Sequence, residues 1–315
     1  MSKETSKPYV CVIGAANVDI CGYPDSTLIP RTSNIGRISV SMGGVGRNIA
    51  ENIARMGIKT KLITAVGCDG YGRMIAEYSE AAGIDTSEFV TVQDSISSTY
   101  MAILDSNNDM AVAIANTKIL DNLTIDLAET KLDLIRKSRA CVLDAGCSKE
   151  FMRFVTENCP QTDFFLDTVC TEKAKKVIDY LGNFHTIKPN IFEAEVLAKM
   201  PIKTKDDIFE ASEIFLREGV KKVFISLGQD GVFYNDGKDK GFMSIRHVKV
   251  VNVTGAGDAF VSALVYSHLN GFDTTETLKF ALSAAYIALS YKDAVNPNMS
   301  VNLIKEKMKE LDYVG

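Results

Sequence analysis

The sequence predicts an α/β fold in which a central, mainly parallel sheet is covered by helices on both faces. Short apolar runs such as "ACVLDAG", "DFFLDTV" and "FHTIKPN" are separated by stretches with helical spacing, and this alternation is typical of parallel sheets. The 315 residues suffice for one large domain with an extensive core, and 46% hydrophobic with 24% charged residues is an ordinary globular composition. We therefore expect a single domain over residues 1–315.

The first elements follow from local patterns. The apolar run Tyr9–Ile13 predicts a buried strand, and the proline-containing segment that follows it predicts strands and turns rather than a helix. Beyond the double glycine at 43–44, apolar residues at helical spacing predict a helix that ends at Gly57. "KTKLITAVG" then predicts a strand, and Tyr71–Ala82 a helix.

A hairpin interrupts this rhythm. "STYMAILD" and "DMAVAIAN" flank the turn residues Ser106, Asn107 and Asn108, which predicts two antiparallel strands. We expect the two β-type insertions, 18–42 and 97–115, to pair as a small sheet outside the main one and to serve as a lid.

The last third predicts two strands about a turn in "KKVFISLGQDGVFYND", followed by a strand that ends at Val253. Ala259–Leu269 and Thr275–Leu289 are apolar enough to form buried helices.

Charge and cysteine content restrict the function. With 35 Lys and Arg against 40 Asp and Glu, the net charge of −5 offers no basic face for a nucleic acid or an anionic membrane, so a small-molecule ligand is expected. The seven cysteines are odd in number and form no CxxC pair, which favours reduced thiols in a cytoplasmic protein. "MSKETSKPY" leads into no signal-peptide core, and no apolar run approaches the 18 residues typical of a membrane span.

The stretch "VTGAGDAF", residues 253–260, allows two interpretations. Glycines between a strand and a helix leave backbone N–H groups free to bind an anion at the helix N-terminus, with Asp258 within reach as a base. Alternatively, Thr254 caps the helix and Asp258 merely complements its dipole. The stretch alone does not separate the two.

Other common sites are absent from the sequence. It contains no GxxxxGK[ST] loop and no GxGxxG after the first strand, which argues against a P-loop protein and a dinucleotide fold. His185, His247 and His268 are isolated along the chain, with no zinc-hydrolase spacing.

Four motifs in one order resemble the ribokinase, or phosphofructokinase-B, family of sugar and nucleoside kinases: "GGVGRNIAENIARMG" (43–57), "KPNIFEAE" (188–195), "SLGQDG" (226–231) and "VTGAGDAF". They span nearly the whole chain. The resemblance implies a ribokinase-like three-layer α/β/α fold with a β lid, ATP as phosphoryl donor and Mg²⁺ as cofactor. It assigns Asp258 as the catalytic base and the backbone of Gly255, Ala256 and Gly257 as the anion hole.

The same resemblance implies the substrate-binding residues. Asn17 and Asp19 stand two apart after the first strand, on one side of an extended chain, and would bind sugar hydroxyls. An Asx turn at Asn17 with a solvated Asp19 is the alternative. Backbone at Gly43 and Gly44 would approach the sugar, and two side chains would complete the site. These are Asn48 and Arg47, although Arg47 could equally be a solvated surface arginine.

On the nucleotide side, Asn190, Ser226, Gly228, Gly231 and Thr254 would bind ATP, and Glu193 would act on Mg²⁺ through water. Asn190 with Glu193 also matches a capping box, and "GQDG" is also an ordinary turn. Asn252 stands where ribokinase has an aspartate at a potassium site, so K⁺ dependence is left open.

Within the family, "IGAANVDICGY", "GGVGRNIA", "NVTGAGDA" and "NPNMSV" are most similar to bacterial pseudouridine kinases. This implies transfer of the γ-phosphoryl group to the 5′-hydroxyl of pseudouridine. Ribose, a hexose or another nucleoside is the alternative acceptor, and a catalytically silent nucleoside or nucleotide sensor is the alternative of another class. By analogy with the family we also expect a homodimer formed through the lid. By position alone, Thr99, Asn116 and Lys118 are candidates for reading the base.

Overall fold

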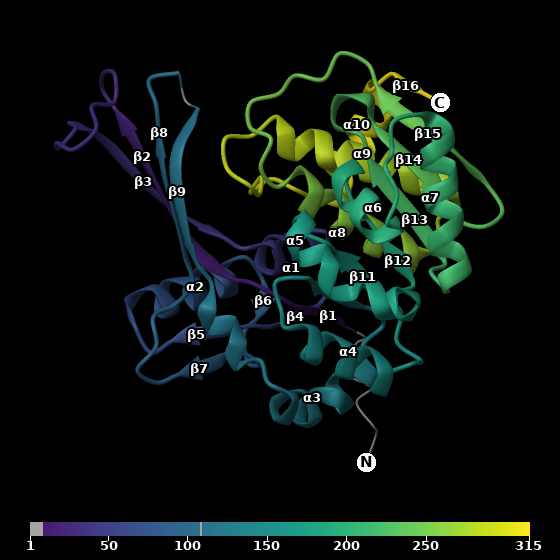
Figure 1. The fold of residues 1–315 in the computed structure, drawn as a ribbon, viewed down its shortest axis with the longest axis horizontal. Coiled ribbons are helices and arrows are strands. Elements are labelled where there is room, and N and C mark those ends of the chain that lie inside the picture. Colours follow the sequence, from purple (N-terminus) through teal and green to yellow (C-terminus); the bar gives the residue numbers. More distant parts are fainter. Residues whose placement is uncertain (1–8, 108) are drawn as a thin grey trace.

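A ten-stranded sheet forms the centre of the molecule (Figure 1). The computed structural model describes residues 9–107 and 109–315, so Asn108 of the predicted turn and the stretch before Tyr9 lie outside the described residues. The strand order is β16-β15-β14-β13-β12-β11-β10-β1-β4-β6. The strands are β1 Val10–Ile13, β4 Thr60–Ile63, β6 Ile84–Asp85, β10 Cys141–Asp144, β11 Phe164–Asp167, β12 Thr186–Ile187, β13 Lys222–Ser226, β14 Val232–Asn235, β15 Lys240–Ile245 and β16 Tyr313–Val314.

The sheet is mainly parallel, which confirms the predicted fold class. All neighbours from β6 to β13 pair in parallel, and β14, β15 and β16 continue the sheet in antiparallel pairs. The carboxyl ends of β10, β11 and β12 therefore lie side by side at one edge of the sheet, where α/β proteins place their ligands.

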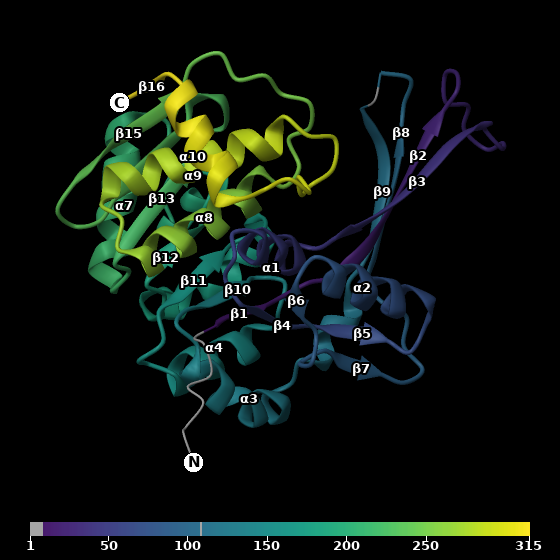
Figure 2. The same cartoon turned by 180° about the vertical axis from the view of Figure 1, so that it is seen from behind.

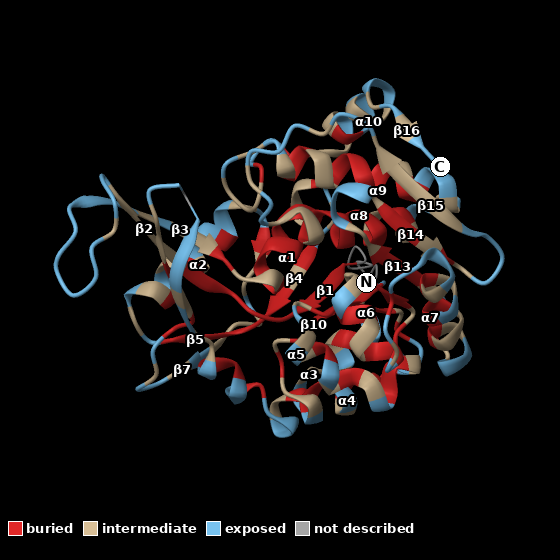
Figure 3. Ribbon diagram, turned by 45° about the horizontal axis from the view of Figure 1, so that its top comes forward, coloured by how far each residue is buried: buried red, intermediate tan, exposed pale blue. Residues whose placement is uncertain are grey.

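Helices cover both faces of this sheet and complete three layers. Side chains of β1 alternate between two buried clusters, with Cys11 and Ile13 in one and Val10 and Val12 in the other, so the strand is buried on both sides (Figure 3). The first cluster includes side chains from α3 Ile125–Lys137, α4 Lys149–Asn158, α6 Ile191–Ala198 and α7 Lys205–Glu218; the second includes side chains from α1 Val45–Arg55, α2 Gly70–Ala81, α8 Ala256–Asn270, α9 Thr274–Leu289 and α10 Val301–Glu310. Shorter helical segments are α5 Thr171–Ala174, η1 Lys118–Asn122, η2 Lys175–Asn183 and η3 Gly228–Asp230.

A separate four-stranded sheet projects from the body (Figures 1 and 2). Its order is β3-β2-β8-β9, with β2 Asn17–Pro24, β3 Gly36–Gly43, β8 Thr99–Leu104 and β9 Met110–Asn116. The predicted hairpin corresponds to β8 and β9, which pair antiparallel, whereas β2 and β8 pair in parallel. Two further short strands, β5 Ala65–Gly67 and β7 Val90–Val92, form a sheet of their own, so "KTKLITAVG" supplies two strands instead of the one predicted.

The predicted strand ending at Val253 is wrong. β15 ends at Ile245, and residues 246–255 form a loop whose Val251 N–H donates to the main-chain oxygen of Leu289. Val253 is 74% exposed, because this segment runs over the surface with no strand beside it. The segment is rich in β-branched residues, which favour a strand, but the fold provides no neighbouring strand for it to pair with.

No helix among the described residues is long and apolar enough to span a bilayer.

Candidate active site

The first turn of α8 lies at the carboxyl edge of the sheet. Gly255 is its N-cap residue, with a φ of 83°, and a Cβ at this position would overlap the main-chain oxygen of Ala294. Glycine is therefore required here by both conformation and space. The helix has no side-chain cap, so the alternative in which Thr254 caps it is wrong. The N–H groups at the start of an α-helix lack partners within the helix, and the helix dipole adds positive potential there.

Asp258, in this first turn, is only 8% exposed. The Nδ2 of Asn48, on α1, donates to Asp258 Oδ2 over 2.8 Å and fixes the carboxylate. Burial, and then the negative charge of Asp167, raise the pKa of Asp258 to about 7, although the Asn48 hydrogen bond and the charge of Lys188 oppose the shift. A carboxylate with this pKa is half ionised near neutral pH, as a general base requires.

Two further buried aspartates stand next to this site, and we did not predict them. Asp144 ends β10 and Asp167 ends β11, 1% and 5% exposed. Asp144 accepts hydrogen bonds from the main-chain N–H groups of Ala15 (2.7 Å) and Gly46 (3.1 Å), which ties β10 to the segments that bear the predicted substrate residues. The signal was present in the sequence, because the two neighbouring parallel strands each end in Leu-Asp.

Lys188 is the buried cation of the site. In the sequence it begins the motif "KPNIFEAE", which by itself predicted no role for the lysine. Its Nζ lies 3.9 Å from Asp167 Oδ2, and a Cβ built on Gly257 would be 3.2 Å from the same Nζ. The ammonium group therefore lies directly beside the first turn of α8. A positive charge at this position adds to the anion-binding potential of the helix N-terminus.

The predicted substrate residues come together beside α1. Asn17 and Asp19 are both on β2, and the Asn17 amide donates to the Asp19 carboxylate. A Cβ on Gly43 would overlap this carboxylate, so glycine is needed for the approach. Burial raises the pKa of Asp19 to about 6, against the lowering effects of Asn17 and of Arg47. The alternative with an Asx turn at Asn17 is wrong, since Asn17 begins a strand.

Arg47 is buried, at 4% exposed, so the surface-arginine alternative is wrong. The helix that begins after Gly44 turns this position inward, where the Arg47 guanidinium pairs with Glu51 at 2.9 Å. Burial lowers the pKa of Arg47, an effect that Glu51 opposes. Among the described residues, Arg47 Nε and Asn48 Oδ1 are buried without a hydrogen-bond partner. Buried polar atoms of this kind normally have partners, so both are suited to a polar ligand.

A cavity of about 750 Å³ opens beside the start of α8. Lys188 and Gly257 line it, and Asn190 joins them from the start of α6. Of the residues predicted on the nucleotide side, Ser226, Gly228 and Gly231 line the cavity, whereas Thr254 does not. The remaining wall is mostly apolar: Val232, Ile245, Val248, Val250, Val253, Phe260, Leu282, Ala285, Tyr286 and Leu289.

Asn190 and Glu193 form a complete capping box at the start of α6. Glu193 Oε2 accepts hydrogen bonds from the Asn190 main-chain N–H (2.9 Å) and the Thr168 hydroxyl (2.6 Å). Glu193 Oε1 accepts from Asn190 Nδ2 over 2.8 Å. The alternative in which this motif caps the helix is therefore present in the structure. Because both carboxylate oxygens are already engaged, contact with Mg²⁺ through water fits this glutamate better than direct coordination.

Asn252 fastens the loop before α8. Its Nδ2 donates to the main-chain oxygen of Lys292, and its Oδ1 accepts from the Thr254 N–H. The side chain thus bridges two surface loops.

A buried carboxylate beside the free N–H groups of a helix N-terminus and a buried lysine suits the transfer of a phosphoryl group, the chemistry of a phosphotransferase. Residues 7–300 match the family profile described as pfkB family carbohydrate kinase, so the chain belongs to that family. It is an enzyme that transfers a phosphoryl group to a hydroxyl acceptor of the carbohydrate or nucleoside class.

Among individual relatives, a pseudouridine kinase of Escherichia coli (strain K12) is 34% identical over 94% of this chain and 95% of its own length. A crystal structure of a protein described as a candidate sugar kinase from Clostridium perfringens shares 38% identity, covers 98% of both chains and has a TM-score of 0.89. The structure of Arabidopsis thaliana ribokinase, complexed with ribose and ATP, is 22% identical, covers 96% of this chain and 99% of its own, and has a TM-score of 0.85. This last likeness concerns the fold.

Proposed function

We propose that the chain transfers the γ-phosphoryl group of ATP to the 5′-hydroxyl of a nucleoside, and that pseudouridine is the physiological acceptor. The acceptor is supported by the 34% identical pseudouridine kinase, which is similar over nearly the full length. Arg47, buried beside Asp19 and with an unpartnered Nε, supports an acceptor that has a carbonyl-bearing base as well as a sugar.

The observation that carries the chemistry is the pair formed by Asn48 and Asp258. Asp258 accepts the proton as the 5′-oxygen forms a bond to the γ-phosphorus and the bond from that phosphorus to the β–γ bridging oxygen breaks, giving ADP. Asn48 holds one carboxylate oxygen in place by its Nδ2, and its free Oδ1 can accept from a substrate hydroxyl. Positioning of this kind supplies much of the rate in phosphoryl transfer.

Charge that develops on the transferred group is met by the start of α8. The N–H groups at Gly255, Ala256 and Gly257 and the ammonium of Lys188 converge there. In this proposal Asp167 does not fully neutralise the positive charge of Lys188, because the 3.9 Å between Asp167 Oδ2 and Lys188 Nζ is longer than the distance in a close ion pair.

The cavity beside α8 suits ATP. Its apolar wall, with Phe260 and Tyr286, offers a face for the adenine ring, and the turn at Ser226 and Gly228 offers small residues near Lys188. Mg²⁺, when bound, neutralises the phosphate charge, and Asn190 with Glu193 would orient its water ligands. Thr254 lies outside the cavity lining, so this proposal gives its side chain no part in binding ATP.

In this proposal residues 1–315 form one domain, and the small sheet serves as its lid. β2 carries Asn17 and Asp19 at its start, and Thr99 of β8 pairs with Val18. Thr99 and Asn116 face each other across β8 and β9, so both remain candidates for reading the base, as does the exposed Lys118 on η1. Closure of such a lid excludes water, which would otherwise accept the phosphoryl group.

The lid is also the surface proposed to form a homodimer. Ile38, Val40, Val112 and Ile114 are 51–72% exposed on this sheet. Apolar side chains exposed on a sheet commonly mark an interface. Ile38→Lys together with Ile114→Lys should convert a dimer into a monomer in analytical ultracentrifugation. A wild-type protein that sediments as a monomer at micromolar concentration would contradict this.

A coupled assay of ADP formation tests the acceptor. With ATP and Mg²⁺ present, pseudouridine should give the highest kcat/KM among pseudouridine, uridine, adenosine, ribose and a hexose. Robust turnover of ribose without turnover of pseudouridine would assign the alternative sugar-kinase function. ATP binding without ADP formation from any acceptor would favour the nucleoside or nucleotide sensor. Repeating the assay with K⁺ replaced by a quaternary ammonium ion decides the monovalent-cation requirement.

A further inference from the structure

Two of the three histidines meet at the edge of the central sheet opposite the proposed active site. His185 and His268 are isolated along the chain, but the fold brings them together in space. His185 directly precedes β12, Asp163 directly precedes β11, and His268 lies in the last turn of α8. Because β11 and β12 are parallel neighbours, their starts lie side by side, and α8 brings its C-terminal end to the same place.

We propose that Asp163, His185 and His268 form a binding site for a divalent transition-metal ion of the zinc class. One potential ligand atom from each residue lies within 4.8 Å of the other two. Two imidazoles and a carboxylate are a common donor set for Zn²⁺, with water completing the coordination. Ligands at tetrahedral Zn²⁺ are about 3.3 Å apart, which small side-chain rotations reach from here.

Contacts within and around the cluster hold the ligands close together. His268 Nε2 lies 2.9 Å from Asp163 Oδ2, so two of the ligands already meet. His185 Nδ1 is 2.8 Å from the Thr186 hydroxyl, a contact of the type that orients metal-binding imidazoles. Phe165 contacts both rings, with centroid distances of 5.8 Å to His185 and 5.4 Å to His268. The rings therefore keep their mutual orientation with little loss of entropy on metal binding.

Nearby charge sets the expected affinity. The main-chain N–H groups of Lys221 and Lys222 donate to the main-chain oxygen of His185 at 3.0 and 2.9 Å, so both lysines lie next to the cluster. The same two lysines repel a dication, whereas Asp163 attracts it. We therefore expect a metal affinity in the micromolar range, well below that of a closed structural zinc site.

The bound ion would join β11 and β12 to the far end of the helix that carries Asp258. Ten residues separate Asp258 from His268, about 15 Å along the helix axis. The ion would stabilise the fold and leave the phosphoryl transfer itself unchanged. This site is independent of which acceptor the kinase uses.

Titration of the full-length protein with Co²⁺ and Zn²⁺ tests the proposal. Cys68 and Cys170 are exposed, so the experiment uses a Cys68→Ser, Cys170→Ser background to remove thiol binding at the surface. We expect one equivalent of Co²⁺ with a visible d–d spectrum and a higher melting temperature with Zn²⁺. His185→Gln and His268→Gln should each weaken binding by more than about 100-fold, since even outer-sphere partners contribute 10–100-fold.

Nuclear magnetic resonance of the imidazole signals provides a second readout that needs no variant. The chain has 3 histidines, so assignment is simple. Zn²⁺ should shift the signals of His185 and His268 and leave that of His247 in place. Absence of saturable binding, equal affinity in His268→Gln, or a shift confined to His247 would each overturn the site.

Discussion

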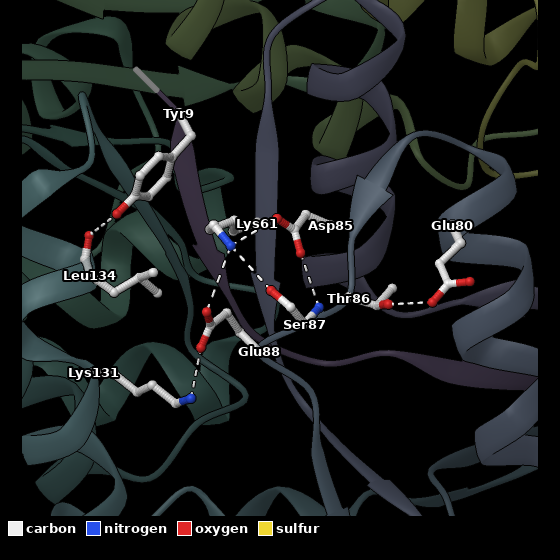
Figure 4. A network of polar contacts seen from close by, with 9 residues as sticks. All are labelled: Tyr9, Lys61, Glu80, Asp85, Thr86, Ser87, Glu88, Lys131 and Leu134. Carbon is white, nitrogen blue, oxygen red and sulfur yellow. Dashed lines mark hydrogen bonds and ion pairs between the residues drawn. The ribbon is translucent and has the colours of Figure 1, made fainter. Parts of the chain in front are cut away.

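Two aspartates, Asp85 at the end of strand β6 and Asp258 in the first turn of helix α8, differ in their charge environment. Asp85, at the end of β6, accepts from Lys61 Nζ at 2.8 Å and from the Ser87 N–H at 3.0 Å, within a network in which Lys61 and Lys131 also pair with Glu88 (Figure 4). Burial alone would raise the pKa of Asp85, but the hydrogen bonds from Lys61 and Ser87 lower it to about 2.

Asp258 shows the opposite balance. The charges that act on it are two more carboxylates, Asp167 and Asp144, and the ammonium group of Lys188, and burial with these carboxylates raises its pKa to about 7. Paired carboxylates stabilise a fold, whereas a crowded buried carboxylate reduces stability and is available for proton transfer. The comparison therefore separates a structural carboxylate from one that the fold retains for chemistry.

Replacement of the proposed base should have the largest effect. Asp258→Asn removes the proton acceptor and should lower kcat by about 10²–10⁴-fold, while ATP binding measured by calorimetry stays near that of the wild type. Asp85→Asn, the matched replacement in the paired network, should leave kcat unchanged. Near-normal turnover in Asp258→Asn would contradict the assignment.

The same two variants should move stability in opposite directions. At pH 8 both aspartates are ionised in the folded and unfolded states, so Asp258→Asn relieves a buried charge and should raise the free energy of unfolding by up to about 4 kcal/mol. Asp85→Asn breaks a partly exposed ion pair and should lower it by about 1 kcal/mol. Urea unfolding measures both.

The size of the Asp258 effect on stability depends on pH. Because its folded pKa is raised, the protonated carboxyl favours the folded state, and this contribution is lost as the pH rises from about 4 to about 7. The stability gap between Asp258→Asn and the wild type should therefore close as the pH falls through this window. A gap that stays constant from pH 8 to pH 4 would contradict the raised pKa.

Loss of the positioning amide should have an intermediate effect. Asn48→Ala removes a hydrogen bond to a charged group, worth about 1.5–3 kcal/mol, and should lower kcat/KM by about 10–100-fold. It should also move the acid limb of the pH–rate profile upward, because this hydrogen bond opposes the rise in the Asp258 pKa. Asn270→Ala, at the exposed far end of α8, is the control and should change neither quantity.

The wild-type enzyme should show the same titration without any substitution, by about tenfold for each pH unit. Only ionised Asp258 can accept the proton, so kcat/KM for the nucleoside should be level above about pH 7 and fall by about tenfold per pH unit below it. Asp19, whose pKa is raised to about 6, would steepen the fall at lower pH. A flat profile between pH 5 and 8 would exclude Asp258 as the group that limits the rate.

Local patterns in the sequence were enough for much of the fold and for one part of the site. The strand and helix alternation predicted the parallel sheet, and the glycine turn with Asp258 is contained in one short stretch at the start of α8. The strand predicted to end at Val253 failed because β-branched residues were read without knowledge of a partner strand.

The rest of the site depends on which strands become neighbours. Asp144, Asp167 and Lys188 lie at the carboxyl ends of three different strands, and the order β10, β11, β12 brings them together. The burial of Arg47 and the meeting of His185 with His268 have the same origin, since packing of the helices against the sheet decides both. No single-segment pattern contains such information.

A carboxyl ¹³C titration of the selectively labelled protein, free of ligands, tests the central comparison most directly, because it observes both aspartates in one sample. The account predicts an inflection at about 7 for Asp258 and at about 2 for Asp85. Assignment comes from the Asp258→Asn and Asp85→Asn spectra. Inflections for both residues near 4, the ordinary aspartate value, would contradict the account.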